Sequence, residues 1–169
     1  MDTLDAVFTR RSIRKYTDKA VPEELITDLL KAAMAAPSAG NEQAWQFIVI
    51  RDRAILDAIP KFHPYSAMLK YAAVAVLICG DLTLEKFKGF WVQDCSAATQ
   101  NLLLAATTMG LGAVWTGIYP LEERVVGMRK LLNLPEHVIP LSLVPIGFPA
   151  EQPGRADRFN AERVHRDRW

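Results

Sequence analysis

A cluster of positive charge lies near the start of the chain, where residues 10–15 read RRSIRK. Arginine presents a planar fork of donors and serine adds a short hydroxyl donor, and together they match the oxygens of a phosphate group. The candidate phosphate ligands are Arg10, Arg11, Ser12 and Arg14. A simpler explanation fits the same residues about as well, because positive charge at the end of a helix interacts favourably with the helix dipole.

A second candidate site is the loop of residues 36–45, which read APSAGNEQAW. Its small residues allow the backbone to approach a flat ligand closely. Asn41 and Gln43 each offer hydrogen-bond donors and acceptors, which suits a heteroaromatic ring that alternates carbonyl groups and nitrogens. Taken alone, the segment is more typical of an ordinary capped loop.

Two further segments have candidate ligands. Residues 110–117 (GLGAVWTG) resemble a dinucleotide fingerprint, but the glycines follow an expected helix and precede an expected strand, the reverse of the order that a Rossmann site needs. Gly117 remains a place where backbone could approach a cofactor ring. In the tail, one arginine could close over a phosphate, although interleaved acids indicate a solvated segment; the arginines are Arg155, Arg158, Arg163, Arg166 and Arg168.

Side chains alone offer little chemistry. The histidines His63, His137 and His165 are scattered without ligand spacing, so no metal site is expected. Cys79 and Cys95 lie in apolar surroundings and are expected in the core. Neither a nucleophile elbow nor a phosphate-binding loop occurs. This absence indicates that a cofactor carries the reaction.

Composition limits the class of protein. The chain has 169 residues, half of them hydrophobic, and a formal net charge of +1. One ordinary domain is therefore expected, without bulk attraction to nucleic acid or an anionic membrane. Two cysteines and an N-terminus without a long apolar run indicate a reduced, cytoplasmic setting. The stretch without charge after Asp94 contains polar residues and glycines, so a buried helix and strand are preferred over a membrane span.

Helical and strand patterns alternate along the chain. Helices are expected from Thr3 as N-cap, from Pro22 to before Pro37, and over residues 53–59, 66–71, 90–109 and 121–132. Strands are expected over residues 45–50, 74–79, 113–116 and 138–146. Pro140 and Pro145 predict an edge or interrupted position for the last strand. The fold class is α+β in one domain.

The tail contains isolated aromatic residues, Phe159 and Trp169. These side chains and Val164 would gain from packing on a second subunit, because a lone aromatic at a chain end is normally exposed. A tail folded back on its own domain is about as compatible with the residues.

The order of these motifs resembles the FMN-dependent nitroreductase family, in its small, single-domain members. The similarity begins at residues 10–16 (RRSIRKY) and 37–45 (PSAGNEQAW), and continues at 91–95 (WVQDC), 100–103 (QNLL), 110–117 (GLGAVWTG) and 163–169. Ala44 stands where the family usually has proline. In residues 63–70 the chain has no clear equivalent of the asparagine and lysine that larger members place over the flavin.

This resemblance implies an α+β nitroreductase-like fold, with a mixed, mostly antiparallel sheet flanked by helices, in an intertwined homodimer. It implies one domain over residues 1–169, whose tail at residues 153–169 packs on the partner subunit. Two FMN sites lie at the interface, and no metal is implied. The implied cofactor ligands are Arg10, Arg11, Ser12, Arg14, Thr116, Gly117 and Arg158, with Pro37, Ser38, Asn41 and, more weakly, Gln43 from the partner subunit.

The implied activity is that of an FMN-dependent NAD(P)H oxidoreductase. NADH or NADPH reduces the flavin at N5, and a nitroaromatic, a quinone or a similar small acceptor reoxidises it on the same face. No side chain is expected as an obligatory acid or base. The alternative is a non-catalytic flavin- or nucleotide-binding sensor. A nucleic-acid-binding module is a weaker third hypothesis, because the net charge is near zero.

Overall fold

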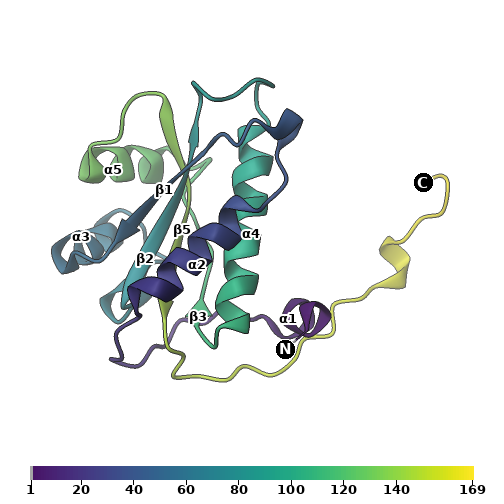
Figure 1. Cartoon of the computed structure of the whole chain (residues 1–169), viewed down its shortest axis with the longest axis horizontal. Helices are drawn as coiled ribbons and strands as arrows, with labels where there is room; N and C mark the ends of the chain where they lie inside the picture. The colour runs from purple at the N-terminus through teal and green to yellow at the C-terminus, as the bar shows by residue number, and fades with distance from the viewer. Residues whose placement is uncertain (1) are drawn as a thin grey trace.

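Five strands of apolar and β-branched residues form one sheet at the centre of the computed structural model, which describes residues 2–169 (Figure 1). The strands are β1 (Trp45–Ile50), β2 (Val74–Asp81), β3 (Gly112–Ala113), β4 (Thr116–Gly117) and β5 (Val138–Gly147). Their order is β1-β2-β5-β3, with β4 also paired to β5, and every strand pair is antiparallel. The expected α+β class and the mostly antiparallel sheet are confirmed.

Helices cover both faces of the sheet, with α2 and α4 on one side and α3 and α5 on the other (Figure 1). The α-helices are α1 (Thr3–Thr9), α2 (Glu23–Met34), α3 (Arg53–Ala58), α4 (Trp91–Thr108) and α5 (Glu122–Leu132). Short 3₁₀ turns form η1 (Ala39–Asn41), η2 (Ile59–Lys61), η3 (Ala67–Lys70) and η4 (Ala161–Arg163). Each face of the sheet therefore buries its own hydrophobic cluster against a helix pair.

Most expected elements are present, with three local corrections. The N-cap of α1 is Asp2 and not Thr3, because the Asp2 carboxylate accepts a hydrogen bond from Asp5 N at 2.8 Å. The α-helix expected over residues 53–59 ends at Ala58, and the chain continues as the 3₁₀ turn η2, where Pro60 lies at an early position and its missing N–H costs nothing. The helix expected over residues 66–71 is only the 3₁₀ turn η3.

Of the two alternatives predicted for the last strand, the edge position is wrong, because β5 lies inside the sheet between β2 and the pair β3 and β4, whereas its pairing is interrupted near both prolines. Pro140 is tolerated beside a register shift in β2 at Ile78 and Cys79. Pro145 lies opposite the break between β3 and β4, where a missing N–H interrupts the ladder without loss. Because Pro145 has no N–H to donate at this point, the strand expected over residues 113–116 divides into β3 and β4.

Helix α4 ends in a turn that directs the chain into β3. Gly110 has a positive φ of 73°, and Leu111 N donates to Ala106 O at 2.8 Å. This bond pattern is a Schellman motif, in which a glycine adopts the left-handed conformation without strain. The glycine that follows the expected helix over residues 90–109 therefore terminates it, and the short β3 follows directly.

Both cysteines lie in the core, as expected. Cys79 and Cys95 have no exposed surface, and Cys95 Sγ donates to Cys79 O at 3.4 Å. Burial raises the pKa of Cys79 to about 12 and also raises that of Cys95. Thiols held protonated in this way are poor nucleophiles. Across residues 2–169, no helix is both long and apolar enough to cross a bilayer.

The tail does not fold back on its own domain. Residues 152–169 are exposed throughout, and the segment passes beside α1 and then extends away from the sheet (Figure 1). Phe159 exposes 80% and Trp169 101% of its surface. Apolar side chains of this size at full exposure are unfavourable in water, so the fold-back alternative is not the one that this chain adopts.

Candidate functional site

The positively charged segment near the N-terminus lies along β3. Ser12 forms a parallel bridge with Ala113, and Ile13 N donates to Ala113 O at 3.0 Å. Gly112 allows this approach, because a Cβ there would lie 2.5 Å from Ile13 Cγ2. Gly112 therefore allows the backbone of residues 10–15 to lie against β3. This pairing fixes the backbone positions from which the side chains of Ser12 and Arg14 extend.

The carboxylate of Glu151, from the other end of the chain, holds the backbone of this segment at Arg14 and Lys15. Glu151 Oε1 accepts hydrogen bonds from Arg14 N at 2.6 Å and Lys15 N at 3.1 Å. The Arg14 backbone N–H is the main reason why the pKa of Glu151 is lowered. Tyr16 also fastens the segment, since its hydroxyl donates to Ile13 O at 2.7 Å. These contacts leave the Arg14 side chain exposed and directed by a rigid backbone.

Arginines that are far apart in the sequence lie close together in space. Partial burial lowers the pKa of Arg10, and the positive charges of Arg158 and Arg11 lower it further. In the described chain no carboxylate oxygen lies within ion-pair distance of Arg10, Arg14 or Arg158. Like charges kept together without a counter-ion raise the energy of the folded state unless an anion binds between them. The structure thus brings Arg158 to the first cluster.

Arg11 has a different setting. Its Nε donates to Gly154 O at 2.9 Å, and its Nη1 donates to Phe8 O at 3.1 Å and Arg10 O at 2.6 Å. The guanidinium therefore joins helix α1 to the start of the tail. Its Nη2 is buried and has no hydrogen-bond partner among residues 2–169.

A cleft of about 410 Å³ opens beside Arg14. Thr116 and Gly117 of β4 line it, and both were expected near the flavin ring. Thr116 is buried, and its hydroxyl is satisfied there because it donates to Leu143 O at 2.7 Å. The remaining lining residues are His63, Pro64, Tyr65, Ala67, Met68, Val114, Trp115 and Arg124. The structure therefore brings Arg14, Thr116 and Gly117 together at one cleft.

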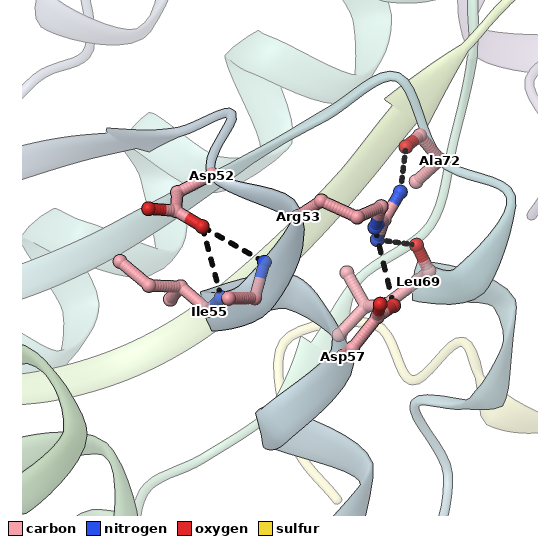
Figure 2. Close-up of polar contacts among 7 residues, drawn as sticks. Asp52, Arg53, Ile55, Asp57, Leu69 and Ala72 are labelled. Carbon is pink, nitrogen blue, oxygen red and sulfur yellow. Dashed lines mark hydrogen bonds and ion pairs between the residues drawn. The ribbon is translucent and has the colours of Figure 1, made fainter.

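One wall of the cleft comes from η3, and Arg53 fixes this turn (Figure 2). Arg53 donates from Nη2 to Leu69 O and from Nη1 to Ala72 O at 3.2 Å, and its Nε lies 3.1 Å from Asp57 Oδ1. Asp52 begins the same helix by accepting from Ala54 N at 2.8 Å. A single side chain thus ties α3 to the turn that contains Ala67 and Met68.

The loop with Pro37, Ser38, Asn41 and Gln43 is largely exposed and is braced by its own hydrogen bonds. Ser38 Oγ accepts from Gln43 N at 3.0 Å, and Gln43 Nε2 donates to Asn41 Oδ1 at 2.9 Å. Asn41 and Gln43 adopt positive φ values of 54° and 51°. Asn41 and Gln43 therefore present their side chains to the surface from a fixed backbone, although Ala44 replaces the family's proline.

Two buried carboxyl groups hold this loop to the body. Asp94 Oδ1 accepts from Ala39 N at 2.9 Å, and Glu42 Oε2 accepts from Lys86 N and Phe87 N at 2.6 and 3.0 Å. Desolvation raises the pKa of Asp94, and the neighbouring Glu42 adds to this rise. Desolvation also acts on Glu42, but the two backbone donors and Asp94 outweigh it and lower its pKa. Of the two carboxyl groups, Asp94 is therefore the one that holds a proton more readily.

The loop and the arginine segment lie at opposite ends of α4. Asp94 is in the first turn, beside Ala39, whereas Thr107 is in the last turn and lines a hollow together with Ile13. The helical rise between these turns is about 20 Å. Within one chain, the predicted ligands therefore form two separate groups.

Sequence reasoning missed several residues of the cleft, namely His63, Tyr65, Met68 and Arg124. Their positions carry no motif, and only the packing of η3 and α5 against β4 brings them together. Segment 62–65 offered one signal, since it places a histidine and a proline between two aromatic residues. Among residues 2–169, no group of three or more His, Cys, Asp or Glu residues is arranged to hold a metal ion.

Known proteins resemble this chain over its whole length. The model of the nitroreductase family matches residues 7–78 and 63–148. A protein of Methanothermobacter thermautotrophicus, named as a candidate NADH dehydrogenase/NAD(P)H nitroreductase, is 60% identical over 169 residues, which cover 100% of this chain and 88% of that protein.

Solved structures of other proteins also resemble this chain in fold. A crystal structure from Parabacteroides distasonis, named in the same way, has a TM-score of 0.96 at 42% identity and covers 99% of this chain and 98% of its own. A candidate nitroreductase from Desulfovibrio desulfuricans, solved in complex with FMN, has a TM-score of 0.86 at 32% identity, covering 100% and 98%. With the fold, the arginine segment and the cleft as described, the chain belongs to the nitroreductase family.

Proposed function

We propose that this protein is an FMN-dependent NAD(P)H oxidoreductase that transfers electrons to a small organic acceptor such as a nitroaromatic or a quinone. The observation that carries the proposal is the cleft lined by Arg14, Thr116 and Gly117, together with the positive charge of Arg158 acting on Arg10, where no carboxylate of the described residues forms an ion pair. The relative from Desulfovibrio desulfuricans, which binds FMN, supports the choice of cofactor.

The residues present fit FMN. Its phosphate matches Arg10, Arg158 and the unpartnered Nη2 of Arg11, since guanidinium groups bind phosphate through charged hydrogen bonds. The ring system matches a cleft that combines apolar walls with the exposed backbone of Gly117. Ser12, placed on β3 by Gly112, adds a hydroxyl donor.

FMN, when bound, supplies the redox chemistry, because it accepts a hydride from NADH or NADPH at N5 and passes electrons to the acceptor. The protein binds and orients the reactants. Arg14, fixed through Glu151, supplies positive charge that stabilises a negatively charged reduced ring. No side chain of the cleft is needed as an acid or base in this proposal.

We further propose that the site is completed across a homodimer. The ligands expected from the loop, Ser38 and Asn41 among them, lie at the opposite end of α4 from Ile13 and cannot reach the same cofactor within one chain. The exposed tail supports a second subunit as well, since Phe159 and Trp169 stay 80% and 101% exposed, although Trp169 stacks on His165.

An absorbance spectrum of the purified protein, taken before and after addition of NADPH, tests the proposed activity. We expect a flavin spectrum that bleaches on reduction and recovers with a nitroaromatic or quinone acceptor. Bound flavin that NADH and NADPH do not reduce would instead indicate a sensor. A colourless protein that cannot be reconstituted with FMN would refute both functions.

The arginine assignments are tested by Arg10→Ala and Arg14→Ala. Loss of a charged hydrogen bond costs about 1.5–3 kcal/mol, so each variant should bind FMN roughly ten- to a hundredfold more weakly. Fluorescence titration of the apoprotein measures this affinity, and circular dichroism checks that folding is intact. Unchanged affinity in both variants would remove these residues from the site.

Deletion of residues 153–169 tests the shared site. The deletion removes Phe159 and Trp169, which we expect to pack on the partner, and Arg158, which we expect to bind phosphate. Both dimerisation and FMN retention should be lost. Phe159→Ser with Trp169→Ser, which keeps Arg158, should weaken the dimer first. A full-length monomer with FMN bound, seen by light scattering at low micromolar concentration, would refute the shared site.

A further inference from the structure

We infer that the wall of the cleft formed by Arg124, Tyr65 and Trp115 binds the carboxylate-bearing ring of an acidic aromatic acceptor. The inference rests on the proposed function, because it names the class of substrate that uses the same cleft. Helix α5 supplies Arg124, the segment before η3 supplies Tyr65, and the break between β3 and β4 supplies Trp115.

The guanidinium of Arg124 is held in place and still has free donors. Its Nη1 donates to Gly117 O at 2.8 Å, and its central carbon lies 5.4 Å from the centre of the Tyr65 ring. Across residues 2–169 the bond to Gly117 is the only hydrogen bond that this side chain makes. Arginine presents several N–H donors in a planar fork, so the remaining ones can bind a carboxylate.

The charge of the cleft favours an anion. None of the residues that line it is acidic, and among the described residues no carboxylate oxygen lies within 4.0 Å of Arg124. Arg14 lines the same cleft, so two positive charges face it without a counter-ion. An organic anion is the ligand that removes this imbalance.

His63 supports the same interpretation. It is fully buried in the wall of the cleft, and among residues 2–169 neither ring nitrogen has a hydrogen-bond partner. Its backbone is fixed, because its N–H donates to Ile59 O and its carbonyl accepts from Ser66 N and Oγ. Burial lowers the pKa of His63 and the charge of Arg124 lowers it further. The imidazole is therefore neutral, and Arg124 is the positive group on this wall.

The neighbouring side chains favour a flat, apolar ligand body over a simple inorganic anion. Tyr65 exposes 72% and Trp115 37% of its surface, and Met68 lines the cleft between η3 and β4. Exposed aromatic faces beside a cation bind planar rings through stacking and burial of apolar area. A carboxylate attached to an aromatic ring satisfies both parts of the wall at once.

Calorimetric titration of the full-length, FMN-loaded protein with benzoate and benzamide tests this inference without requiring turnover. The two probes have nearly the same shape and differ in charge. We expect the protein to bind benzoate more tightly than benzamide. Arg124→Gln should weaken benzoate about ten- to a hundredfold and remove the difference between the probes. Lys130→Gln, which removes an exposed charge from the same helix, should retain it.

Arg124→Lys provides a second variant, because it keeps the charge and should retain a preference for benzoate. Equal affinity of the wild-type protein for both probes would overturn the inference, as would equal losses in Arg124→Gln and Lys130→Gln. If Arg124→Gln changed only the preference for NADPH over NADH, the inference would also be overturned, since the anion that Arg124 recognises would then be the phosphate of the electron donor. Absence of FMN would refute the proposed function alone, because the same titrations can be made on the FMN-free protein.

Discussion

Asp94→Asn should stabilise the protein at pH 8 and flatten the dependence of its stability on pH. Asp94 is 3% exposed and faces Glu42, which is 7% exposed. When both groups are ionised, Glu42 Oε1 and Asp94 Oδ2 are buried acceptors with no hydrogen-bond partner in the described part of the chain. A proton on Asp94 removes this defect, because the protonated carboxyl donates to its neighbour.

The direction of the pH effect follows from the two pKa shifts. The pKa of Asp94 is raised, so its contribution to stability is present at low pH and is lost as the pH rises through the folded-state pKa. The pKa of Glu42 is lowered, so its contribution is lost only as the pH falls below the ordinary range of a glutamate. The wild-type protein should therefore lose stability on the alkaline side of the Asp94 transition.

Asparagine reproduces the protonated state at every pH. Its Oδ1 accepts from Ala39 N as before, and its amide donates to Glu42. An unpartnered buried polar group costs about 1–3 kcal/mol, so Asp94→Asn should raise the free energy of unfolding at pH 8 by about that amount. At a pH where wild-type Asp94 is protonated, the gain should vanish.

Urea unfolding followed by circular dichroism, at one protein concentration and from pH 5 to 9, measures this effect. Asp28→Asn is the matched control, because Asp28 is an exposed carboxylate of α2 whose ion pair with Lys31 adds little. It should change neither the stability nor its pH dependence appreciably. An Asp94→Asn protein that is no more stable than the wild type at pH 8, with the same pH dependence, would refute the protonation of Asp94.

Two other contacts lead to predictions. Arg53→Ala should lower the free energy of unfolding by about 1–2 kcal/mol, because hydrogen bonds to two backbone carbonyls and a half-exposed ion pair are lost. Urea unfolding measures this change, and a loss no larger than that of Lys31→Ala would contradict the prediction. Glu151→Ala should weaken FMN binding severalfold, because the Arg14 backbone N–H loses its acceptor. Fluorescence titration measures the affinity, with Glu162→Ala as the control. Unchanged affinity in Glu151→Ala would show that Arg14 needs no such support. Since the pKa of Glu151 is lowered, wild-type FMN affinity should hold until the pH falls below the ordinary glutamate range.

Local patterns were sufficient for the elements whose signals do not depend on distant neighbours. The strand at Trp45–Ile50 has the bounds that its aromatic and β-branched residues predicted. Helix α4 begins and ends within one residue of its expected limits, since apolar periodicity and the glycine after it are encoded in the same short segment. The order of the motifs was likewise enough to indicate the family, because that order is visible in the sequence without any knowledge of contacts.

Partners distant in the sequence were decided only by the tertiary structure. Pro140 and Pro145 predicted an edge or an interrupted strand, and only the structure shows that β5 lies inside the sheet, with the break between β3 and β4 opposite Pro145. No spacing rule joins Glu42 to Asp94, or Glu151 to Arg14, because each pairing depends on how several elements pack at once. The residue types of this chain determine which groups can bind phosphate or an acidic ring, whereas the path of the backbone determines which of those groups meet.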